Sequence, residues 1–280
     1  MNIEAHARDV VSFYDRHPIN EQQILEKLQL DGIDLSRLNE DILQNYDMDH
    51  YDGVEAIDIL AQGAGIAAAS QVLDVASGMG GPARYLAHNY GCRVTGIDLT
   101  ESRVEGAKRL TELAGLSDRV AFRTANALAN PFPDQAFDVV IGQEAWCHIP
   151  EKEQLIAECV RVTRAGGHIA FTDILERGGL NSDDREKLRQ GMGFADLGTL
   201  AGYQGLLAAA GCVVAAAEDL SARWAVILRH RLEMYRSLEA QTVAQVGEAT
   251  YRRWDDIYSL FVSSVENGHL GGGRFLARRV

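Results

Sequence analysis

From residue 71 onward, short apolar runs alternate with longer stretches in which apolar residues recur with helical spacing. The apolar runs predict five buried strands, at 72–75, 93–98, 120–124, 137–141 and 167–174. The periodic stretches between them predict helices at 82–90, 101–113 and 151–162. Strands that alternate with helices of about ten residues indicate an α/β fold with a parallel, doubly wound sheet.

The pattern changes after the fifth strand. A helix at 200–210 and a sixth strand at 213–217 are followed by two long helices, at 222–238 and 248–265. A last strand is expected from Gly271 to the end of the chain. The two long helices therefore form a helical insertion, about 222–268, before the final strand.

The region before the first strand has a different character. Short amphipathic helices are expected between residues 9 and 43, with breaks at His17-Pro18 and at Asp31-Gly32. A segment that is both polar and aromatic, 46–53, then leads into a helix at 54–62. We expect an N-terminal helical lid over residues 1–65 and a main domain over residues 66–280.

Composition narrows the function classes. The 280-residue chain has a formal net charge of −13, which argues against nucleic-acid binding and anionic membranes because phosphate groups require a basic surface. The start of the chain does not resemble a signal peptide, and no apolar run is long enough to span a bilayer. The four cysteines form no CxxC pair, so no metal site or disulfide framework is indicated and a cytoplasmic location is expected. The oligomeric state stays open, a homo-oligomer included.

Three glycines follow the first strand directly and precede a helix: Gly78, Gly80 and Gly81. Glycines at such a turn let the backbone approach a ligand closely. Asp98 ends the second strand twenty residues after Gly78, where a carboxylate can accept hydrogen bonds from ribose hydroxyls. The alternative role for Asp98 is that of an anion at a helix N-terminus.

An acidic residue inside the first strand separates two cofactor classes. Asp74 precedes the glycines by one turn and would repel the diphosphate of a nicotinamide cofactor. It suits S-adenosylmethionine (SAM), which carries an ammonium and a sulfonium. Ala83 still fits the dinucleotide fingerprint, so a dehydrogenase remains an alternative.

Four segments together resemble the ordered motifs of class I SAM-dependent methyltransferases, which have a Rossmann-like fold. These are VLDVASGMGG, GIDLT, ANALANPFPDQAFDVV and VTRAGGHIAFTD, which span Val72 to Asp173. The resemblance implies SAM as the cofactor and nine cofactor-binding residues: Asp74, Ser77, Gly78, Gly80, Asp98, Leu99, Asn126, Ala127 and Gln143. Two positions depart from the family pattern, since Ala76 and Asn126 stand where glycine and aspartate are usual.

Within that class the chain resembles the sarcosine/dimethylglycine N-methyltransferases at 143–150, 196–203 and 269–275. This resemblance implies methyl transfer to a small-molecule acceptor, an amine. O- or C-methylation of a sugar, phenol or isoprenoid is the alternative, and a non-catalytic SAM- or partner-binding module is another. Resembling sugar O-methyltransferases carry a His-His pair where this chain has Cys147-His148, which weakens the O-methylation hypothesis.

Five residues are candidates for the acceptor side. Glu144 and Trp146 follow the fourth strand and could hold a substrate ammonium, the latter by a cation–π contact unless it packs in the core. His148 is a candidate base or a turn-stabilising residue. Asp173 ends the fifth strand at the same edge, and the resemblance implies that Tyr51 closes the pocket.

The aromatic stripes around Trp224 and Trp254 are expected to be helix-packing surfaces. Arg223 or Arg274 could meet a substrate carboxylate, and nothing in the sequence selects either.

Overall fold

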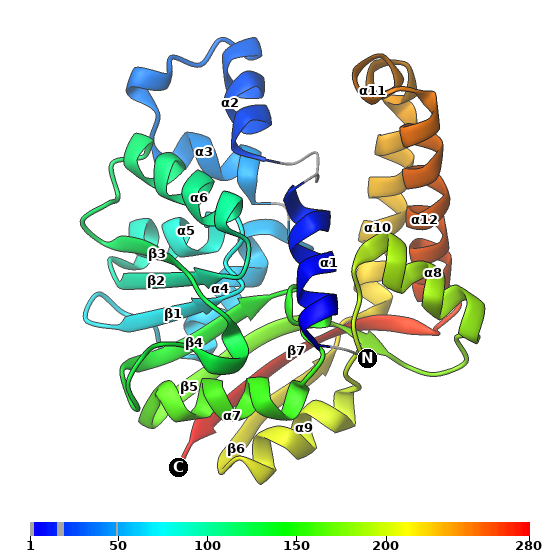
Figure 1. The fold of residues 1–280 in the computed structure, drawn as a ribbon. Coiled ribbons are helices and arrows are strands. Elements are labelled where there is room, and N and C mark those ends of the chain that lie inside the picture. Colours follow the sequence, from blue (N-terminus) through cyan, green and yellow to red (C-terminus); the bar gives the residue numbers. More distant parts are fainter. Residues whose placement is uncertain (1–2, 16–19, 49) are drawn as a thin grey trace.

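The computed structural model describes residues 3–15, 20–48 and 50–280 (Figure 1). The helix break expected at His17-Pro18 lies outside the described residues.

A seven-stranded sheet with the order β3-β2-β1-β4-β5-β7-β6 forms the centre of the molecule. Its strands are β1 (Gln71–Val75), β2 (Arg93–Asp98), β3 (Val120–Thr124), β4 (Phe137–Gln143), β5 (Thr163–Glu176), β6 (Cys212–Asp219) and β7 (Leu270–Arg279). Neighbours among the first five pair in parallel, whereas β7 runs antiparallel between β5 and β6. The predicted α/β class is confirmed. Strand order reverses between β1 and β4, which is where open α/β sheets bind ligands.

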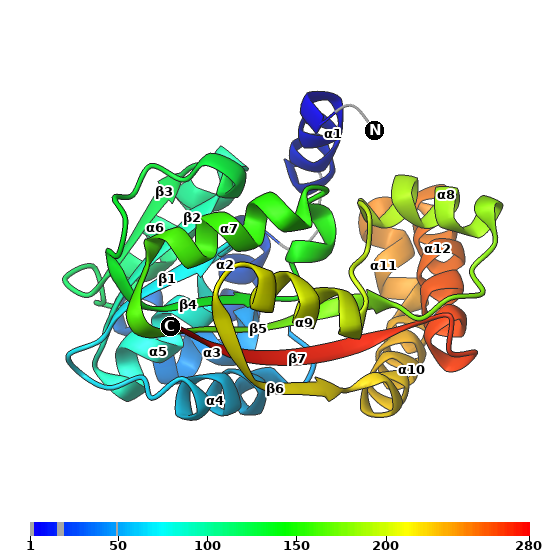
Figure 2. The same ribbon diagram turned by 90° about the horizontal axis from the view of Figure 1, so that it is seen from below.

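Helices cover both faces of the sheet because its strands are apolar on both sides. Along β1, Val72 packs with α4 (Gly53–Gly63) and α5 (Gly81–Tyr90), while Leu73 and Val75 pack with α7 (Lys152–Val162) and α9 (Leu200–Ala209). Figure 2 shows the sheet between these two helix layers. The helix α6 (Glu101–Leu113) packs against β2 and β3.

The N-terminal helices do not share one environment. The helices α2 (Glu21–Leu30) and α3 (Glu40–Asp47), capped by the side chains of Asn20 and Asn39, pack through leucine and isoleucine side chains onto Leu110 of α6. The break predicted at Asp31-Gly32 is confirmed, since α2 ends there. In contrast, α1 (Ile3–Asp15) stands between the core and the helical insertion (Figure 1).

The insertion contains more helix than the sequence pattern indicated. The predicted pair corresponds to α10 (Ser221–Ser237) and α12 (Glu248–Glu266), and the short α11 (Glu239–Val246) joins them. A further helix, α8 (Ser182–Met192), follows β5 and packs on α12. The prediction missed α8 because it is strongly polar and buries only Leu188.

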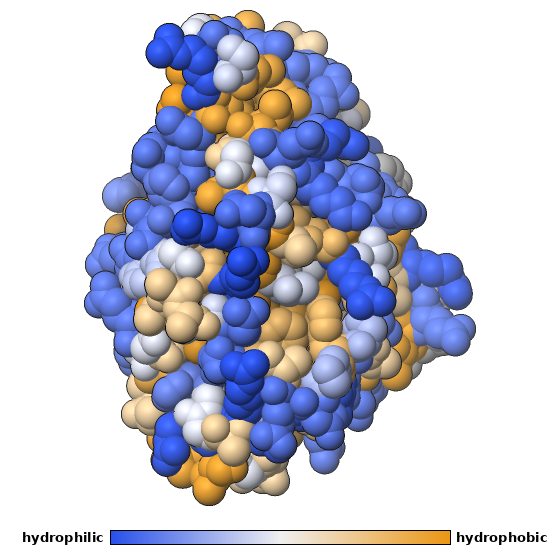
Figure 3. Space-filling model, turned by 90° about the vertical axis from the view of Figure 1, so that its left-hand side faces the viewer, coloured by the Kyte–Doolittle hydropathy of each residue, from blue (hydrophilic) through white to orange (hydrophobic). Residues whose placement is uncertain are grey.

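The outer surface shown in Figure 3 is largely hydrophilic, with an apolar patch at the end of the molecule where α2 lies. Leu30 at the end of α2 is 83% exposed. No helix in the described part of the chain is long and apolar enough to cross a membrane.

Candidate active site

A cavity of about 680 Å³ opens at the carboxyl edge of the sheet, at the β1/β4 reversal. One end is lined by the glycine turn after β1 and by residues that follow β2, β3 and β4. The other end is lined by α1 and by the insertion helices α10 and α12. The volume lies within the range of small-molecule sites.

The turn after β1 is built from left-handed backbone. Gly78 and Gly80 have φ values of +52° and +80°, and Ala76 has a φ of +63°. A Cβ on Gly80 would lie 2.3 Å from the ring of Phe122, so glycine is required there for space as well as conformation. The φ of Ala76 explains why the family usually has glycine at this position, because glycine adopts such a φ without strain and alanine does not.

Asp98, at the end of β2, holds this turn in place by hydrogen bonds from backbone N–H groups. Its Oδ2 accepts from the Gly78 N–H at 2.9 Å, and its Oδ1 accepts from the Thr100 N–H at 2.8 Å. The bond to the Thr100 N–H agrees with the alternative role at a helix N-terminus, and the ribose contact stays a prediction, for which each carboxylate oxygen retains a lone pair at the cavity wall. Nearby, Leu99 and Ala127 also line the cavity.

Asn126 lines the same end of the cavity, and a hydrogen bond from the backbone fixes the orientation of its side-chain amide. Its Oδ1 accepts from the Leu128 N–H at 2.9 Å, which caps the short 3-10 helix η2 (Ala127–Ala129). A second lone pair on that oxygen can still accept from an adenine amino group.

Two buried side chains near the turn have polar atoms without partners. Asp74 is 3% exposed, and its Oδ2 has no hydrogen-bond partner among the described residues. Both amide atoms of Gln143, at the end of β4, likewise lack partners within the described ranges. Burial raises the pKa of Asp74 to about 7. These groups fit a cationic ligand such as SAM, and they would disfavour a diphosphate.

Glu144 is held at the cavity wall in a left-handed conformation, with a φ of +51°. Its Oε2 accepts from the Tyr51 N–H at 3.0 Å and lies 3.3 Å from Nδ1 of His50. Its Oε1 accepts from the Thr172 hydroxyl at 3.2 Å. Tyr51 itself lines the cavity, with its ring against Trp224 and under the guanidinium of Arg231.

His148 also lines the cavity, and its hydrogen bonds indicate which ring nitrogen carries the proton. Nδ1 donates to the Gly193 carbonyl at 2.9 Å, so Nε2 carries the lone pair and accepts from the Tyr14 hydroxyl at 2.8 Å. Burial lowers the pKa of His148 to about 4, which keeps the ring neutral at ordinary pH. His6 also reaches this residue, with its Nε2 2.8 Å from the His148 carbonyl oxygen.

Sequence reasoning missed His6 and Tyr14. Both lie on α1 and line the cavity, as does Phe13. A signal was present, because positions 6, 13 and 14 share one helix face at a spacing of seven and eight residues.

Two candidates for the acceptor side do not reach the cavity. Trp146 is fully buried in the core, where it stacks on Phe171 and donates from Nε1 to the Val75 carbonyl at 3.3 Å. Asp173 is also fully buried and accepts from the Tyr203 hydroxyl at 2.6 Å and from the Cys147 N–H at 2.8 Å. Their expected substrate contacts are corrected: Trp146 is core, and Asp173 holds the turn that carries His148.

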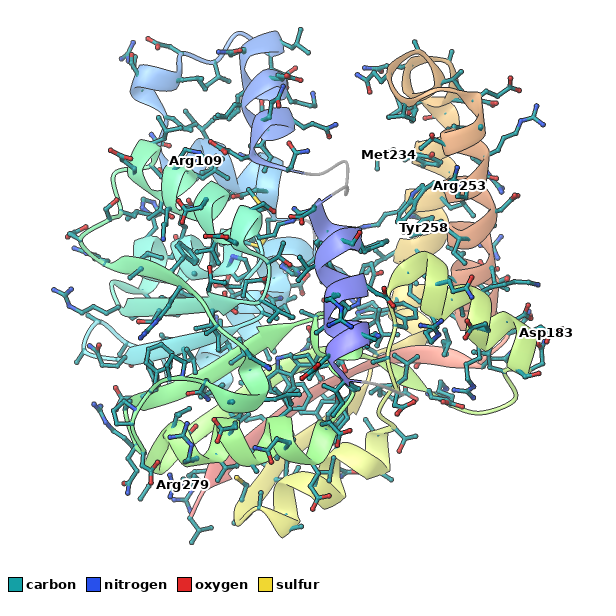
Figure 4. All side chains as sticks on the ribbon, viewed as in Figure 1. Arg109, Asp183, Met234, Arg253, Tyr258 and Arg279 are labelled. Carbon is teal, nitrogen blue, oxygen red and sulfur yellow. The ribbon has the colours of Figure 1, made fainter. Side chains whose placement is uncertain are left out.

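The wall formed by the insertion is apolar and aromatic. Its apolar and aromatic lining residues are Met234, Tyr235, Trp254 and Tyr258 from α10 and α12, joined by Met192 at the end of α8 and by Phe194; Arg231 of α10 lines the same wall. Trp254 and Tyr258 stack with ring centroids 5.9 Å apart and planes 12° apart. Figure 4 shows Met234 and Tyr258 on the side of the insertion that faces α1. The prediction of a packing surface therefore holds for Trp224, which is 1% exposed, and is wrong for Trp254.

The two arginines considered for a substrate carboxylate lie elsewhere. Arg223 pairs with Asp52 and Glu55, and Arg274 pairs with Glu218. Neither lines the cavity. In the part of the chain that the structure describes, no group of three or more histidine, cysteine or acidic side chains is arranged to hold a metal ion.

Comparisons with known proteins agree with this geometry. The sequence model of the family described as "Methyltransferase domain" matches residues 73–171. The 27-O-demethylrifamycin SV methyltransferase of Amycolatopsis mediterranei (strain S699) is 33% identical over 187 residues, which cover 66% of this chain and 69% of that protein. The sarcosine/dimethylglycine N-methyltransferase of Halorhodospira halochloris is 37% identical over 107 residues, 38% of each chain. The match thus spans less than half the length of this second relative.

A solved structure extends the likeness to nearly the whole fold. Phosphoethanolamine N-methyltransferase 2 of Haemonchus contortus, in complex with S-adenosyl-L-methionine, superposes with a TM-score of 0.76 at 20% identity. The superposition covers 96% of this chain and 59% of that one. The family follows from the match to the 27-O-demethylrifamycin SV methyltransferase, which covers 69% of that protein. This chain belongs to the SAM-dependent methyltransferases, enzymes that transfer a methyl group to small molecules.

Proposed function

We propose that this methyltransferase methylates a hydroxyl group on a bulky, largely apolar acceptor. The observation that carries the proposal is the neutral His148, whose Nε2 holds the Tyr14 hydroxyl inside the cavity. An amine attacks with its own lone pair, whereas a hydroxyl must lose its proton to a base. A buried base beside the acceptor space therefore favours oxygen.

SAM, when bound, supplies an electrophilic methyl group on a sulfonium. In our proposal Asp98 accepts from the ribose hydroxyls, and Leu99, Asn126 and Ala127 line the adenine site. The cationic amino-acid part is assigned to the end of the cavity that Gln143 lines, next to β1, in which Asp74 lies buried with an oxygen that has no partner among the described residues. Gly78, Gly80 and Ser77 form the turn against which that part packs.

The proton has a short path. The acceptor hydroxyl would give its proton to the Tyr14 oxygen while the Tyr14 proton passes to Nε2 of His148, which would leave the acceptor oxygen free to take the methyl group that SAM would supply. The resulting imidazolium still donates from Nδ1 to the Gly193 carbonyl. Asp173 and the Cys147 N–H hold the turn in place without contacting the acceptor. Proton transfer to a positioned base contributes typically 10²–10⁴-fold to a rate, and a base whose pKa is about 4 is expected at the lower end of that range.

The walls of the acceptor space support an apolar molecule. Four apolar or aromatic side chains from the insertion and two from the end of α8 and the residues after it face Phe13 and Val10 of α1 across the cavity. The positively charged side chains among the described lining residues are Arg103 and Arg231, which donate to the backbone carbonyls of Tyr14 and His50. An amino-acid acceptor such as sarcosine would depend on Arg103 or Arg231 for its carboxylate, because the side chains that α8, α10 and α12 otherwise present to the cavity are apolar or aromatic.

Amine methylation is the second candidate, and Glu144 supports it. A carboxylate at the cavity wall together with aromatic rings can hold an ammonium acceptor, and cation–π contacts contribute roughly 0.5–2 kcal/mol. The similarity to the sarcosine/dimethylglycine enzyme points the same way.

The test is isotope-labelled methyl transfer to a panel of phenols, apolar alcohols, glycine derivatives and ethanolamines. We expect transfer to an apolar hydroxyl, with kcat reduced at least a hundredfold by His148→Gln. Transfer only to amines, unaffected by His148→Gln, would overturn the O-methylation proposal and leave the amine candidate.

The division of the chain at residue 65, with a helical lid before it, stays a prediction. α2 and α3 pack on the domain, so any lid motion falls to α1.

A further inference from the structure

We propose that Asp47, the last residue of α3, is a cofactor-binding residue whose Oδ1 accepts a hydrogen bond from the ammonium of the amino-acid part of SAM. The inference concerns the cofactor site and holds whether the acceptor is a hydroxyl or an amine. No sequence motif pointed to it, because Asp47 lies outside the segment that carries the methyltransferase motifs.

Asp47 is buried at the cavity wall with one oxygen engaged and one without a partner. The residue is 7% exposed and lines the cavity. Its Oδ2 is paired with the guanidinium of Arg84, while its Oδ1 has no hydrogen-bond partner in the described ranges. Oδ1 lies 3.4 Å from the point where a Cβ on Gly81 would stand, at the start of α5. The unpartnered oxygen is therefore beside the glycine turn.

Buried acceptors without a partner among the described residues include Oδ1 of Asp47, Oγ of Ser77 and the amide oxygen of Gln143, all on residues that line the cavity. Oδ2 of Asp74, in β1 just before the glycine turn, is also buried and unpartnered in the described ranges, although Asp74 is not a lining residue. Burial raises the pKa of both carboxyls, and His50, which also lines the cavity, acts electrostatically on each in the opposite direction. An ammonium has three N–H donors and requires about three acceptors when it leaves water. The number and charge of these acceptors match that group.

Arg84 fixes Asp47 in this position. It is fully buried in α5, donates to the Met79 carbonyl of the glycine turn at 2.8 Å and pairs with Glu40 of α3 at 3.3 Å. The same guanidinium thus ties the end of α3 to the turn that approaches the cofactor. The fit is close, since a Cβ on Gly81 would lie 2.8 Å from the Asp47 carbonyl oxygen.

The competing explanation is that Asp47 only neutralises Arg84, and Glu40 provides the matched control. Asp47→Asn and Glu40→Gln each replace a carboxyl partner of Arg84 with an amide of the same shape. Only Asp47 lines the cavity. The full-length variants are titrated calorimetrically with S-adenosylhomocysteine and with 5′-methylthioadenosine, which retains the nucleoside and thioether but lacks the amino-acid part.

We expect Asp47→Asn to weaken S-adenosylhomocysteine binding by roughly ten- to hundredfold, as for a lost hydrogen bond to a charged group. Its binding of 5′-methylthioadenosine should stay within twofold of wild type. Glu40→Gln should change the two affinities equally or not at all. An equal loss for both ligands in Asp47→Asn, or unchanged S-adenosylhomocysteine binding, would overturn the proposal.

A second comparison applies if a single substitution prevents folding by leaving a buried charge uncompensated. The single variant Glu40→Gln retains the Arg84–Asp47 ion pair, and the triple variant Glu40→Gln/Arg84→Met/Asp47→Asn removes both of its charges, so that neither protein leaves a buried charge uncompensated. The same selective loss of S-adenosylhomocysteine affinity is expected between these two proteins. Identical affinities in the pair would contradict the role of Asp47.

Discussion

The hydroxyl of Tyr14 donates a hydrogen bond to Nε2 of His148 at 2.8 Å, and so joins the first helix of the chain to the turn after β4. The two residues are 134 positions apart in the sequence. Because Nδ1 of the same ring donates to a backbone carbonyl, the lone pair at Nε2 is directed at Tyr14. A proton acceptor is thereby completed by a helix that lies outside the methyltransferase motifs.

Removal of this base should lower kcat with little change in KM for the acceptor. We expect His148→Gln to reduce kcat by about 10²-fold and Tyr14→Phe by a smaller factor, since Nε2 then meets the acceptor without a relay. Steady-state kinetics with the acceptor found in the transfer panel measure both. His88→Gln, at an exposed position paired with Asp41, is the control and should behave as wild type. Equal kcat in all three variants would exclude His148 as the base.

Cofactor affinity should depend on pH through Asp74. Burial raises the pKa of this carboxyl to about 7, so the free protein is largely protonated there below neutrality. A nearby ammonium group favours the ionised form of Asp74, and S-adenosylhomocysteine, which carries one, should therefore bind more tightly as pH rises towards about 7, with a plateau above. Calorimetry between pH 5.5 and 8.5 measures this, and Asp74→Asn should flatten the profile. A wild-type affinity independent of pH would contradict this assignment.

The raised pKa of Asp74 should also make the stability of the folded protein depend on pH. The pKa of Asp74 is raised from its ordinary value of 3.8 to about 7, so over that interval the carboxyl binds more protons in the folded protein than in the unfolded chain. The contribution of Asp74 to the free energy of unfolding therefore falls as pH rises from about 4 to 7. Urea unfolding at pH 5 and pH 8 should show a smaller pH-dependent loss of stability in Asp74→Asn than in wild type.

Ala76 offers a test of backbone strain in the glycine turn. Its φ of +63° costs roughly 1–2 kcal/mol, and Ala76→Gly removes this cost while adding about 0.4–1 kcal/mol of unfolded-state entropy. A net stabilisation of about 0.5–1 kcal/mol is expected in urea unfolding. Ala83→Gly, in the helix α5 that follows, is the opposite control and should destabilise by about 1 kcal/mol or more. Destabilisation by both substitutions would mean that Ala76 is not strained.

Alanine substitutions at two tryptophans, Trp146 and Trp254, should affect different properties, the first stability and the second acceptor binding. Trp146→Ala removes a fully buried ring and should lower the free energy of unfolding by about 3–5 kcal/mol. Trp254→Ala opens the cavity wall and should instead raise KM for an apolar acceptor, with a smaller effect on stability. Thermal unfolding and steady-state kinetics on both proteins provide the comparison. An unchanged KM in Trp254→Ala would remove this ring from the acceptor site.

Much of the fold could be predicted because its signals are local. Val72 and Leu73 belong to an apolar run whose length and flanking glycines indicate a buried parallel strand wherever the chain folds. The polar helix α8 escaped prediction because a helix with one buried leucine shows almost no periodic pattern. Position along the chain likewise placed Glu144 and His148 near the cofactor edge, since both follow a strand whose carboxyl end must lie there.

The sequence alone determined the α/β class, the glycine turn, the acidic positions at Asp74 and Asp98 and the methyltransferase motifs, because each depends on residues close together in the chain. Only the tertiary structure decided which neighbours face the cavity. Trp146 and His148 are two residues apart, yet one is core and the other meets Tyr14. It also brought Asp47 and α1 to the site, since contacts across tens of residues arise from packing and leave no periodic trace in the sequence.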